Sequence, residues 1–213
     1  MLERSVAPSH ALLASLLGDL QLTGNISQDV PAFLHQHHHT ATALHCQHVA
    51  ASASVNLVQA EMAGWLHDVS AIFPAKERAH IARTLDLEVL AEEDRCPMIV
   101  HQKLSRLMAR EIFGVTDALI LDAVGCHTTL RPQPTTLDQV LFVADKLAWD
   151  QPGRPPYAGA LQMALEQSLD QATRFFLSYL WERRDSLLVI HPWLRAVVRD
   201  LCEGSEEETQ VFS

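Results

Sequence analysis

The sequence has no long apolar run and no paired-cysteine motif. No uninterrupted apolar stretch approaches the roughly 18 residues that a membrane-spanning helix needs, so we expect no membrane partner. The four cysteines, at positions 46, 96, 126 and 202, include no Cys-x-x-Cys pair, which argues against a zinc ribbon or a disulfide framework and predicts reduced thiols. The first residues lack a strongly basic segment, so we expect no cleaved signal peptide and a cytoplasmic protein.

Positive charge is scarce, and lysine especially so. Lys76, Lys103 and Lys146 are the only lysines, and 16 basic residues against 26 acidic ones leave a net charge of −10. A nucleic-acid partner is therefore not expected. The sequence also lacks a glycine-rich phosphate loop, a Gly-x-Ser-x-Gly motif and a cysteine–histidine nucleophile context, which excludes several common catalytic classes.

Apolar residues and histidines, by contrast, are plentiful. The 213 residues are 48% hydrophobic and 20% charged with a mean hydropathy of +0.03, as expected for one globular domain of ordinary size. Histidine, usually a scarce residue, occurs 12 times. This excess raises the question of metal binding, since imidazole is a common metal ligand.

The spacing of the apolar residues predicts an all-α fold. Apolar positions recur three and four residues apart along most of the chain and do not alternate as in a half-buried strand. Ser27 and Thr136 are the expected starts of two helices, and Gly114 the expected end of another. The expected helices cover 9–20, 27–36, 41–58, 61–69, 99–113, 118–127, 137–149, 157–183 and 192–201, with a polar, acidic middle over 75–83 and 86–94 and loops at 131–134 and 151–156.

Six imidazole and carboxylate groups stand within or beside apolar helical segments, where burial without a partner would be costly. Singly, a histidine in such a place is more often hydrogen-bonded to a carbonyl group, and an aspartate can cap a helix or pair with an arginine. Together, four imidazoles and two carboxylates form a ligand set that suits iron, manganese or zinc. The six residues are His45, His67, Asp68, His101, His127 and Asp145.

The order of these residues and their surroundings resemble a known family. The order His, His-Asp, His, His, Asp is similar to that of the dinuclear-metal branch of the HD-domain superfamily. The flanking segments resemble the YqeK-type family, bacterial symmetrical hydrolases of diadenosine tetraphosphate. The resemblance covers about half of the chain, and its segments are HCQHV at 45–49, AGWLHDV at 63–69, VHQKLSRLMAREIFGVTDALILDAVGCHT at 100–128 and LDQVLFVADKL at 137–147.

The resemblance implies an HD-domain helical bundle with two divalent metal ions, iron by resemblance, with manganese or zinc as alternatives. One ion would be held by His45, His67, Asp68 and Asp145, and the other by Asp68, His101 and His127, with Asp68 bridging. Asp68 and His67 are the expected catalytic residues. The single bundle is expected over 1–204, with N-terminal helices at 1–36, the metal-site core at 41–150, C-terminal helices at 157–201 and an acidic tail at 205–213.

Several polar residues of the family are replaced in this chain, so we expect its contacts with phosphate to differ from those of the family. A lysine of the family is Ala71 here, and its Glu and Arg after the last aspartate are Ala148 and Gln151. Thr42 stands in place of an arginine and Leu130 in place of a glycine. Arg131, Lys146 and His48 are the candidate substrate contacts, while Lys103 and Arg106 are expected to be solvated surface charges.

The function expected from these observations is hydrolysis of a phosphoanhydride in a small nucleoside polyphosphate, with diadenosine tetraphosphate cut to two ADP. The alternatives are a phosphomonoesterase or phosphodiesterase, a nucleotide-binding protein without turnover, and a di-iron oxygenase. A homodimer is left open. Four aromatic residues offer either a stacking platform for a base or the more common core packing, namely Trp149, Tyr157, Trp181 and Trp193. The histidines at 35–39 are expected at an exposed helix start.

Overall fold

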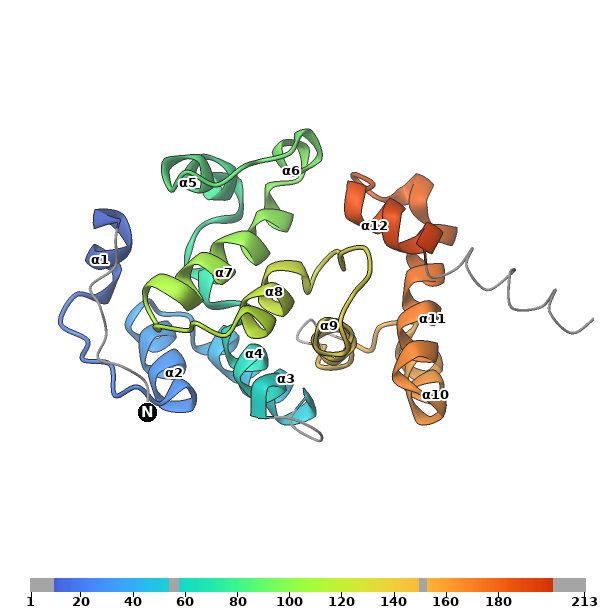
Figure 1. The fold of residues 1–213 in the computed structure, drawn as a ribbon, viewed down its shortest axis with the longest axis horizontal. Helices are drawn as coiled ribbons and strands as arrows, with labels where there is room; N and C mark the ends of the chain where they lie inside the picture. Colours follow the sequence, from blue (N-terminus) through green and yellow to red (C-terminus); the bar gives the residue numbers. More distant parts are fainter. Residues whose placement is uncertain (1–9, 54–57, 150–152, 201–213) are drawn as a thin grey trace, which may run out of the picture.

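The computed structural model describes residues 10–53, 58–149 and 153–200, which form helices and no strand (Figure 1). Short 3₁₀ turns accompany the α-helices at Val69–Ile72, Ala75–Glu77, Pro97–Val100 and Arg184–Ser186. None of the described helices is long and apolar enough to cross a membrane. The α-helices are α1 (Ala11–Leu17), α2 (Ile26–Gln36), α3 (Thr40–Ala53), α4 (Val58–Leu66), α5 (Arg78–Thr84), α6 (Ala91–Arg95), α7 (His101–Glu111), α8 (Ala118–Cys126), α9 (Thr136–Leu147), α10 (Ala158–Gln167), α11 (Leu169–Glu182) and α12 (Pro192–Val198).

Side-chain caps fix the starts of several helices, and two of them differ from the expected residues. Asn25, not Ser27, caps α2, because its side-chain oxygen accepts a hydrogen bond from the backbone nitrogen of Ser27. Thr135, not Thr136, caps α9 in a capping box with Asp138. Such residues satisfy backbone groups that the first helical turn leaves without partners.

One expected helix is interrupted, and the polar, acidic segment 86–94 is helical only in part. The segment 157–183 is not one helix, because Ser168 adopts an extended conformation (φ −168°, ψ 161°) and its hydroxyl caps α11 through the backbone nitrogen of Gln171. The segment 86–94 becomes α-helical only at Ala91. Polar residues at these positions offer the backbone alternative hydrogen bonds, which periodicity alone does not reveal.

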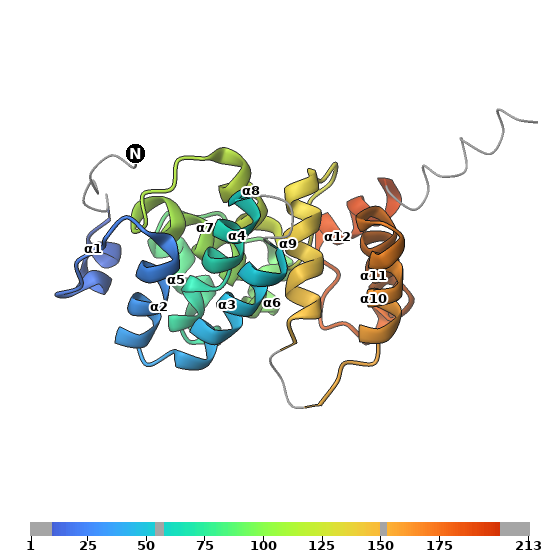
Figure 2. The ribbon, with the colours of Figure 1, turned by 90° about the horizontal axis from the view of Figure 1, so that it is seen from below.

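Two hydrophobic cores share helix α9. The larger core is built mainly from α2, α3, α4, α7 and α8, and the smaller one from the helices after α9. Leu141 and Ala144 of α9 pack into the larger core, while Phe142 and Val143 pack into the smaller one. Figure 2 shows α9 standing between the two groups of helices. The residues of α9 are therefore fixed from both sides.

Helices α3 and α4 pack unusually closely. A Cβ atom added at Gly64 would lie 2.6 Å from both the Cα and the nitrogen atom of Ala50. A glycine is needed at this crossing because any side chain would collide with the backbone of α3. The close packing brings His45 of α3 and His67, directly after α4, to the same place.

Candidate metal centre

All six predicted ligands meet at one pocket, although some are 100 residues apart in sequence. Five of the six line the pocket, which has a volume of about 250 Å³, and His67 lies fully buried beside it. They come from the ends or interiors of helices that pack around the larger core. His45 lies in α3, His67 and Asp68 follow α4, His101 begins α7, His127 follows α8 and Asp145 lies in α9.

The ligand atoms form two overlapping groups. One consists of His45, His67 and Asp145, and the other of His67, Asp68 and His127, and in each group the atoms lie within 4.8 Å of one another. Nε2 of His45 is 3.2 Å from Asp145 Oδ1 and 3.2 Å from His67 Nε2. His67 thus belongs to both groups, whereas the resemblance gives the shared position to Asp68.

His101 completes the second half of the site. Its Nε2 atom lies 3.3 Å from Oδ1 of Asp68, and Nε2 of His127 lies 3.8 Å from the same oxygen. Asp68 therefore stands between His101 and His127 on one side and His67 on the other, with His67 Nε2 3.7 Å from its second oxygen.

Three of the imidazoles are oriented by the same local device. Nδ1 of His67 donates a hydrogen bond to the carbonyl of Gly64 at 2.8 Å, and His101 and His127 do the same with the carbonyl three residues earlier, at 2.6 and 2.8 Å. A carbonyl oxygen can only accept, so the proton resides on Nδ1. In the neutral ring Nε2 is then the atom with the free lone pair, directed into the pocket.

The resulting contact between two lone pairs provides a test of metal binding. The Nε2 atoms of His101 and His127 are only 2.9 Å apart, and neither neutral ring carries a proton there. Two lone pairs at this distance repel each other unless a cation is shared between them. The donor set therefore fits a divalent cation of borderline hardness, which binds imidazole nitrogen and carboxylate oxygen.

The charges of the pocket also match the needs of a metal site. Burial opposes ionisation of Asp68, but the imidazoles beside it, His67 first among them, outweigh burial and lower its pKa to about 2. Burial likewise opposes the charge of Asp145, and Lys146 helps to lower its pKa well below the usual range. Burial lowers the pKa of His127 well below its ordinary value. At neutral pH both carboxylates are ionised and His127 is neutral, as metal ligation requires. Burial opposes the charge of His67, but Asp68 outweighs burial and raises the pKa of His67 well above its ordinary value, so a metal ion bound there would displace a proton.

Of the three candidate substrate contacts, only Lys146 lines this pocket. Its Nζ pairs with the carboxylate of Asp145 and lies 3.4 Å from the carbonyl oxygen of His127. His48 is exposed on α3 and does not line the pocket. The structure corrects the expected position of Arg131, which lines a separate cavity because two carboxylates, those of Asp122 and Asp138, hold it there.

Gln102 is a buried residue at the site that the sequence analysis did not single out. Its Oε1 accepts a hydrogen bond from the backbone nitrogen of Thr128 at 3.1 Å, and its Nε2 donates to Thr129 Oγ1 at 3.1 Å. The hydroxyl of Thr128 lies 3.0 Å from Nε2 of His101. Gln102 therefore holds the turn after His127 against α7. The sequence signal that could have identified Gln102 is that a polar residue directly follows both His101 and His127.

Arg78 adds a positive charge that no sequence signal indicated. Its Nε donates to the carbonyl of Phe73 at 3.0 Å and its Nη1 to that of Met98 at 3.4 Å. The same Met98 oxygen accepts from Nδ1 of His101. Among the described residues no carboxylate lies within ion-pair distance of Arg78. Burial lowers its pKa and Asp68 opposes that shift, which places the cation in the field of the site.

The mouth of the pocket is aromatic. Trp149, 43% exposed, and the buried Tyr157 both line it, and their rings meet edge to face with centroids 6.4 Å apart. Tyr157 packs in the smaller core, which supports ordinary packing for this residue, while Trp149 keeps a face open to solvent. Ala148, at a position where the family has a glutamate, also lines the pocket, whereas Gln151 lies outside the described residues.

Comparisons with known proteins agree with this architecture. The HD-domain family matches residues 36–150. An uncharacterized protein of the pepC 5′ region in Lactococcus lactis subsp. cremoris is 41% identical over 143 residues, which are 67% of this chain and 72% of that protein. The symmetrical bis(5′-nucleosyl)-tetraphosphatase of Bacillus subtilis is 28% identical over 129 residues, 59% of this chain and 68% of that enzyme.

A solved structure has the same fold. The crystal structure of a predicted HD superfamily hydrolase involved in NAD metabolism, from Clostridium acetobutylicum, superimposes with a TM-score of 0.74 at 21% identity. The match covers 83% of this chain and 97% of that one.

The fold and the site define an all-α hydrolase with His and Asp groups that could hold a divalent metal. The chain belongs to the HD-domain family, since that family matches more than half of its length. The predicted all-α HD bundle is confirmed, and so is the resemblance to the YqeK-type group, because two relatives carry the name of symmetrical tetraphosphatase.

Proposed function

We propose that this protein hydrolyses a phosphoanhydride bond of a nucleoside polyphosphate, and that its substrate is diadenosine tetraphosphate, cut symmetrically to two ADP. We further propose that two divalent ions, iron by preference, bind at the six ligands. The observation that carries the metal part is the close approach of the unprotonated Nε2 atoms of His101 and His127. The names of the more distant relatives support the substrate class.

The residues of the pocket would have different roles in metal binding. His45, His67 and Asp145 would hold one ion, and Asp68, His101 and His127 the other, with His67 close to both. When bound, such ions neutralise charge on phosphoryl oxygens and lower the pKa of a water molecule. Gln102 holds the turn that follows His127 through its hydrogen bonds to Thr128 and Thr129.

Substrate binding would rest on few cations. Lys146 is already paired with Asp145, so it offers phosphate only part of its charge. Arg78 does not line the pocket, but its guanidinium hydrogen bonds go to neutral carbonyl groups, so it is a second candidate for a phosphate contact beside the pocket. The open face of Trp149 would stack on a base.

Metal analysis and product analysis test this proposal together. Protein purified without a tag is expected to contain about two equivalents of metal, and Asp68→Asn to contain less than one. With diadenosine tetraphosphate, ADP is expected as the sole nucleotide product. ATP together with AMP would exclude symmetrical cleavage, and release of inorganic phosphate from a monoester would favour a phosphomonoesterase. Absence of metal in the native protein would overturn the metal centre itself.

A nucleotide-binding protein without turnover is the second candidate. Ala71 and Ala148 leave two polar positions of the family without a functional group, while the metal ligands are complete. Tight binding of ADP in the presence of a full complement of metal, with no hydrolysis of any dinucleoside polyphosphate, would support this candidate and exclude the hydrolase.

A further inference from the structure

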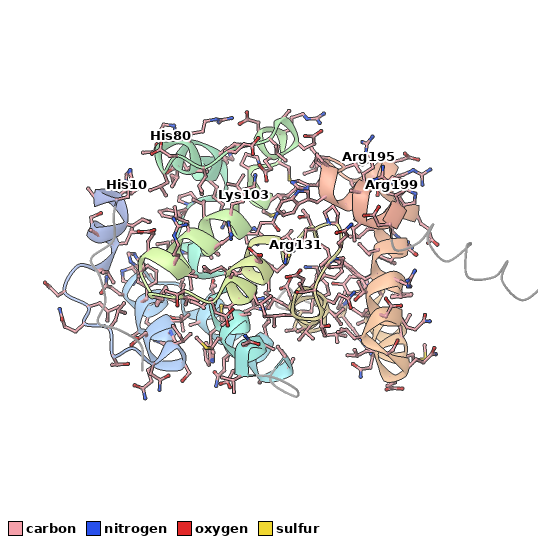
Figure 3. The ribbon with its side chains drawn as sticks, viewed as in Figure 1. His10, His80, Lys103, Arg131, Arg195 and Arg199 are labelled. Atoms are coloured by element: carbon pink, nitrogen blue, oxygen red, sulfur yellow. The ribbon has the colours of Figure 1, made fainter. Side chains whose placement is uncertain are left out.

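A second cavity, of about 420 Å³, shares no lining residue with the metal pocket. It is bounded by α7, α8, the segment before α6 and Trp193 of α12. Figure 3 shows Lys103 on α7 and Arg131 after α8, with Arg195 on the neighbouring α12 and Arg199 directly after it. Its volume lies within the roughly 300–1,000 Å³ typical of small-molecule sites.

The cavity gathers basic side chains in an acidic protein, and each of them is paired with a carboxylate. Lys103, Arg106, Arg110 and Arg131 line it, four of the 16 basic residues of the chain, against two acidic residues, Glu88 and Asp122. The other lining side chains are largely apolar and include Leu87, Leu107 and Leu121 together with the half-buried indole of Trp193. A ligand with an anionic end and a flat apolar end matches this lining.

The arginines are held in defined positions. One carboxylate, that of Asp122, accepts from Nη2 of Arg106 at 2.9 Å and from Nη1 of Arg131 at 2.8 Å. The fully buried Asp138 accepts from Nε of Arg131 at 2.8 Å. Each guanidinium has five donors in a fixed fork, so these contacts orient the forks and leave further donors for an anion.

Gly125 makes the space in which Arg106 lies. A Cβ atom at this position in α8 would come within 2.7 Å of Cδ of Arg106. Glycine within a helix is less stable than alanine. Here it lets the Arg106 side chain lie directly against α8 at the cavity wall.

The charges differ in how freely they can bind a ligand. Arg106 and Arg110 are 51% and 56% exposed, whereas Lys103 is 17% exposed and tied to the buried Glu93 at 2.8 Å. Lys103 is thus not the solvated surface charge that the sequence suggests. Arg106, paired with Asp122, and Arg110, paired with Glu111, lie on successive turns of α7, and their remaining guanidinium donors are the most exposed ones for an incoming phosphate.

We propose that this cavity is a second ligand site, which binds a nucleoside monophosphate or a similar small phosphate that carries an aromatic base. The phosphate lies against Arg106 and Arg110, and the base packs against Trp193 and the leucine wall. This site does not depend on the hydrolase activity proposed above, because it uses none of the metal ligands.

Titration calorimetry with AMP tests the proposal on the full chain. The Asp145→Asn protein separates the two sites, since it alters the metal pocket and leaves the cavity intact. AMP is expected to bind this protein, and the added Arg106→Ala and Arg110→Ala changes are expected to weaken binding by about tenfold for each charge-assisted hydrogen bond lost. The matched control is the pair Arg195→Ala, on α12, and Arg199→Ala, directly after it. Both residues lie outside the lining, and the pair is expected to leave the affinity unchanged.

Two variants of Trp193 and two further ligands test the role of the aromatic base. Trp193→Ala is expected to weaken AMP binding, Trp193→Phe to retain most of it, and inorganic phosphate and adenosine to bind far more weakly than AMP. Equal affinity for phosphate and AMP would overturn the role of the base. Failure of AMP to bind Asp145→Asn, or unchanged binding after loss of both arginines, would overturn the site, whatever the metal and hydrolysis measurements show.

Discussion

The carbonyl oxygen of Gly64 accepts a hydrogen bond from Nδ1 of His67 at 2.8 Å, in the same helical turn in which Gly64 packs against the backbone of Ala50. A close helix crossing of the larger core and the orientation of the central imidazole thus depend on one residue. Packing and metal binding are therefore expected to fail together when this residue is changed.

Gly64→Ala is expected to destabilise the protein by more than about 2 kcal/mol, because its Cβ would lie 2.6 Å from backbone atoms of Ala50. The bound metal should decrease with it, since His67 moves. Urea unfolding and metal analysis measure the two effects. Gly159→Ala in α10 is the matched control, because its Cβ meets nothing closer than 3.8 Å, and it should stabilise by roughly 0.5–1 kcal/mol. Normal metal content in Gly64→Ala would separate the two roles.

Metal removal is expected to destabilise the folded state, since it leaves the facing lone pairs of His101 and His127 without a shared cation. A ligand at about 100 times its dissociation constant contributes about 2.7 kcal/mol, which corresponds to roughly 5–10 °C in melting temperature for a chain of this size. Calorimetry with and without a chelator measures the shift. The exposed His48→Ala should keep the response and Asp68→Asn should lose it, so an equal response in both variants would contradict the assignment.

Glu93 is expected to give the protein a pH-dependent stability. Burial opposes its charge, but hydrogen bonds from His191 and Lys103 outweigh this and lower its pKa. Because the folded pKa lies below the unfolded value of about 4.3, the stabilisation is complete above that pH and is lost as pH falls through the folded pKa. Glu93→Gln should cost about 1–3 kcal/mol at pH 7.

The difference between wild type and Glu93→Gln is expected to shrink in urea unfolding below about pH 4. The control is Glu182→Gln, whose side chain is 73% exposed and which should stay within about 0.5 kcal/mol at either pH. A constant difference between pH 7 and pH 3.5 would show that Glu93 is not held in its ionised form.

Leu130 combines full burial with a left-handed backbone. It has a φ of +50° and a side chain that packs in the smaller core, at the position where the related family has glycine. Leu130→Ala should cost about 2–5 kcal/mol. Leu130→Gly should be no less stable than Leu130→Ala, because glycine relieves roughly 1–2 kcal/mol of backbone strain. At the helical and equally buried Leu141, glycine should instead be less stable than alanine by about 1 kcal/mol. Urea unfolding of the four variants decides this, and the same order at both positions would contradict the strain.

Much of the fold follows from local sequence signals. The apolar spacing around α7, α8 and α9 predicted helices whose bounds differ by a few residues from those observed. Positions where a polar side chain competes for the backbone, such as Ser168, could not be found in this way, because a cap and a helix interior residue have the same spacing. The division into two cores on either side of α9 also depends on long-range packing that the sequence does not display.

For the site, the sequence by itself determined which residues meet. A polar group beside an apolar helix needs a partner. Because six such groups occur in the order of a known family, they were predicted to contact one another. Only the tertiary structure decided the direction in which each side chain points. It turned Arg131 toward Asp122 and Asp138, left His48 on the exposed face of α3, and brought Arg78 to His101 through a shared carbonyl. A long side chain reaches several positions from one Cα atom, and only its neighbours in space fix which of them it occupies.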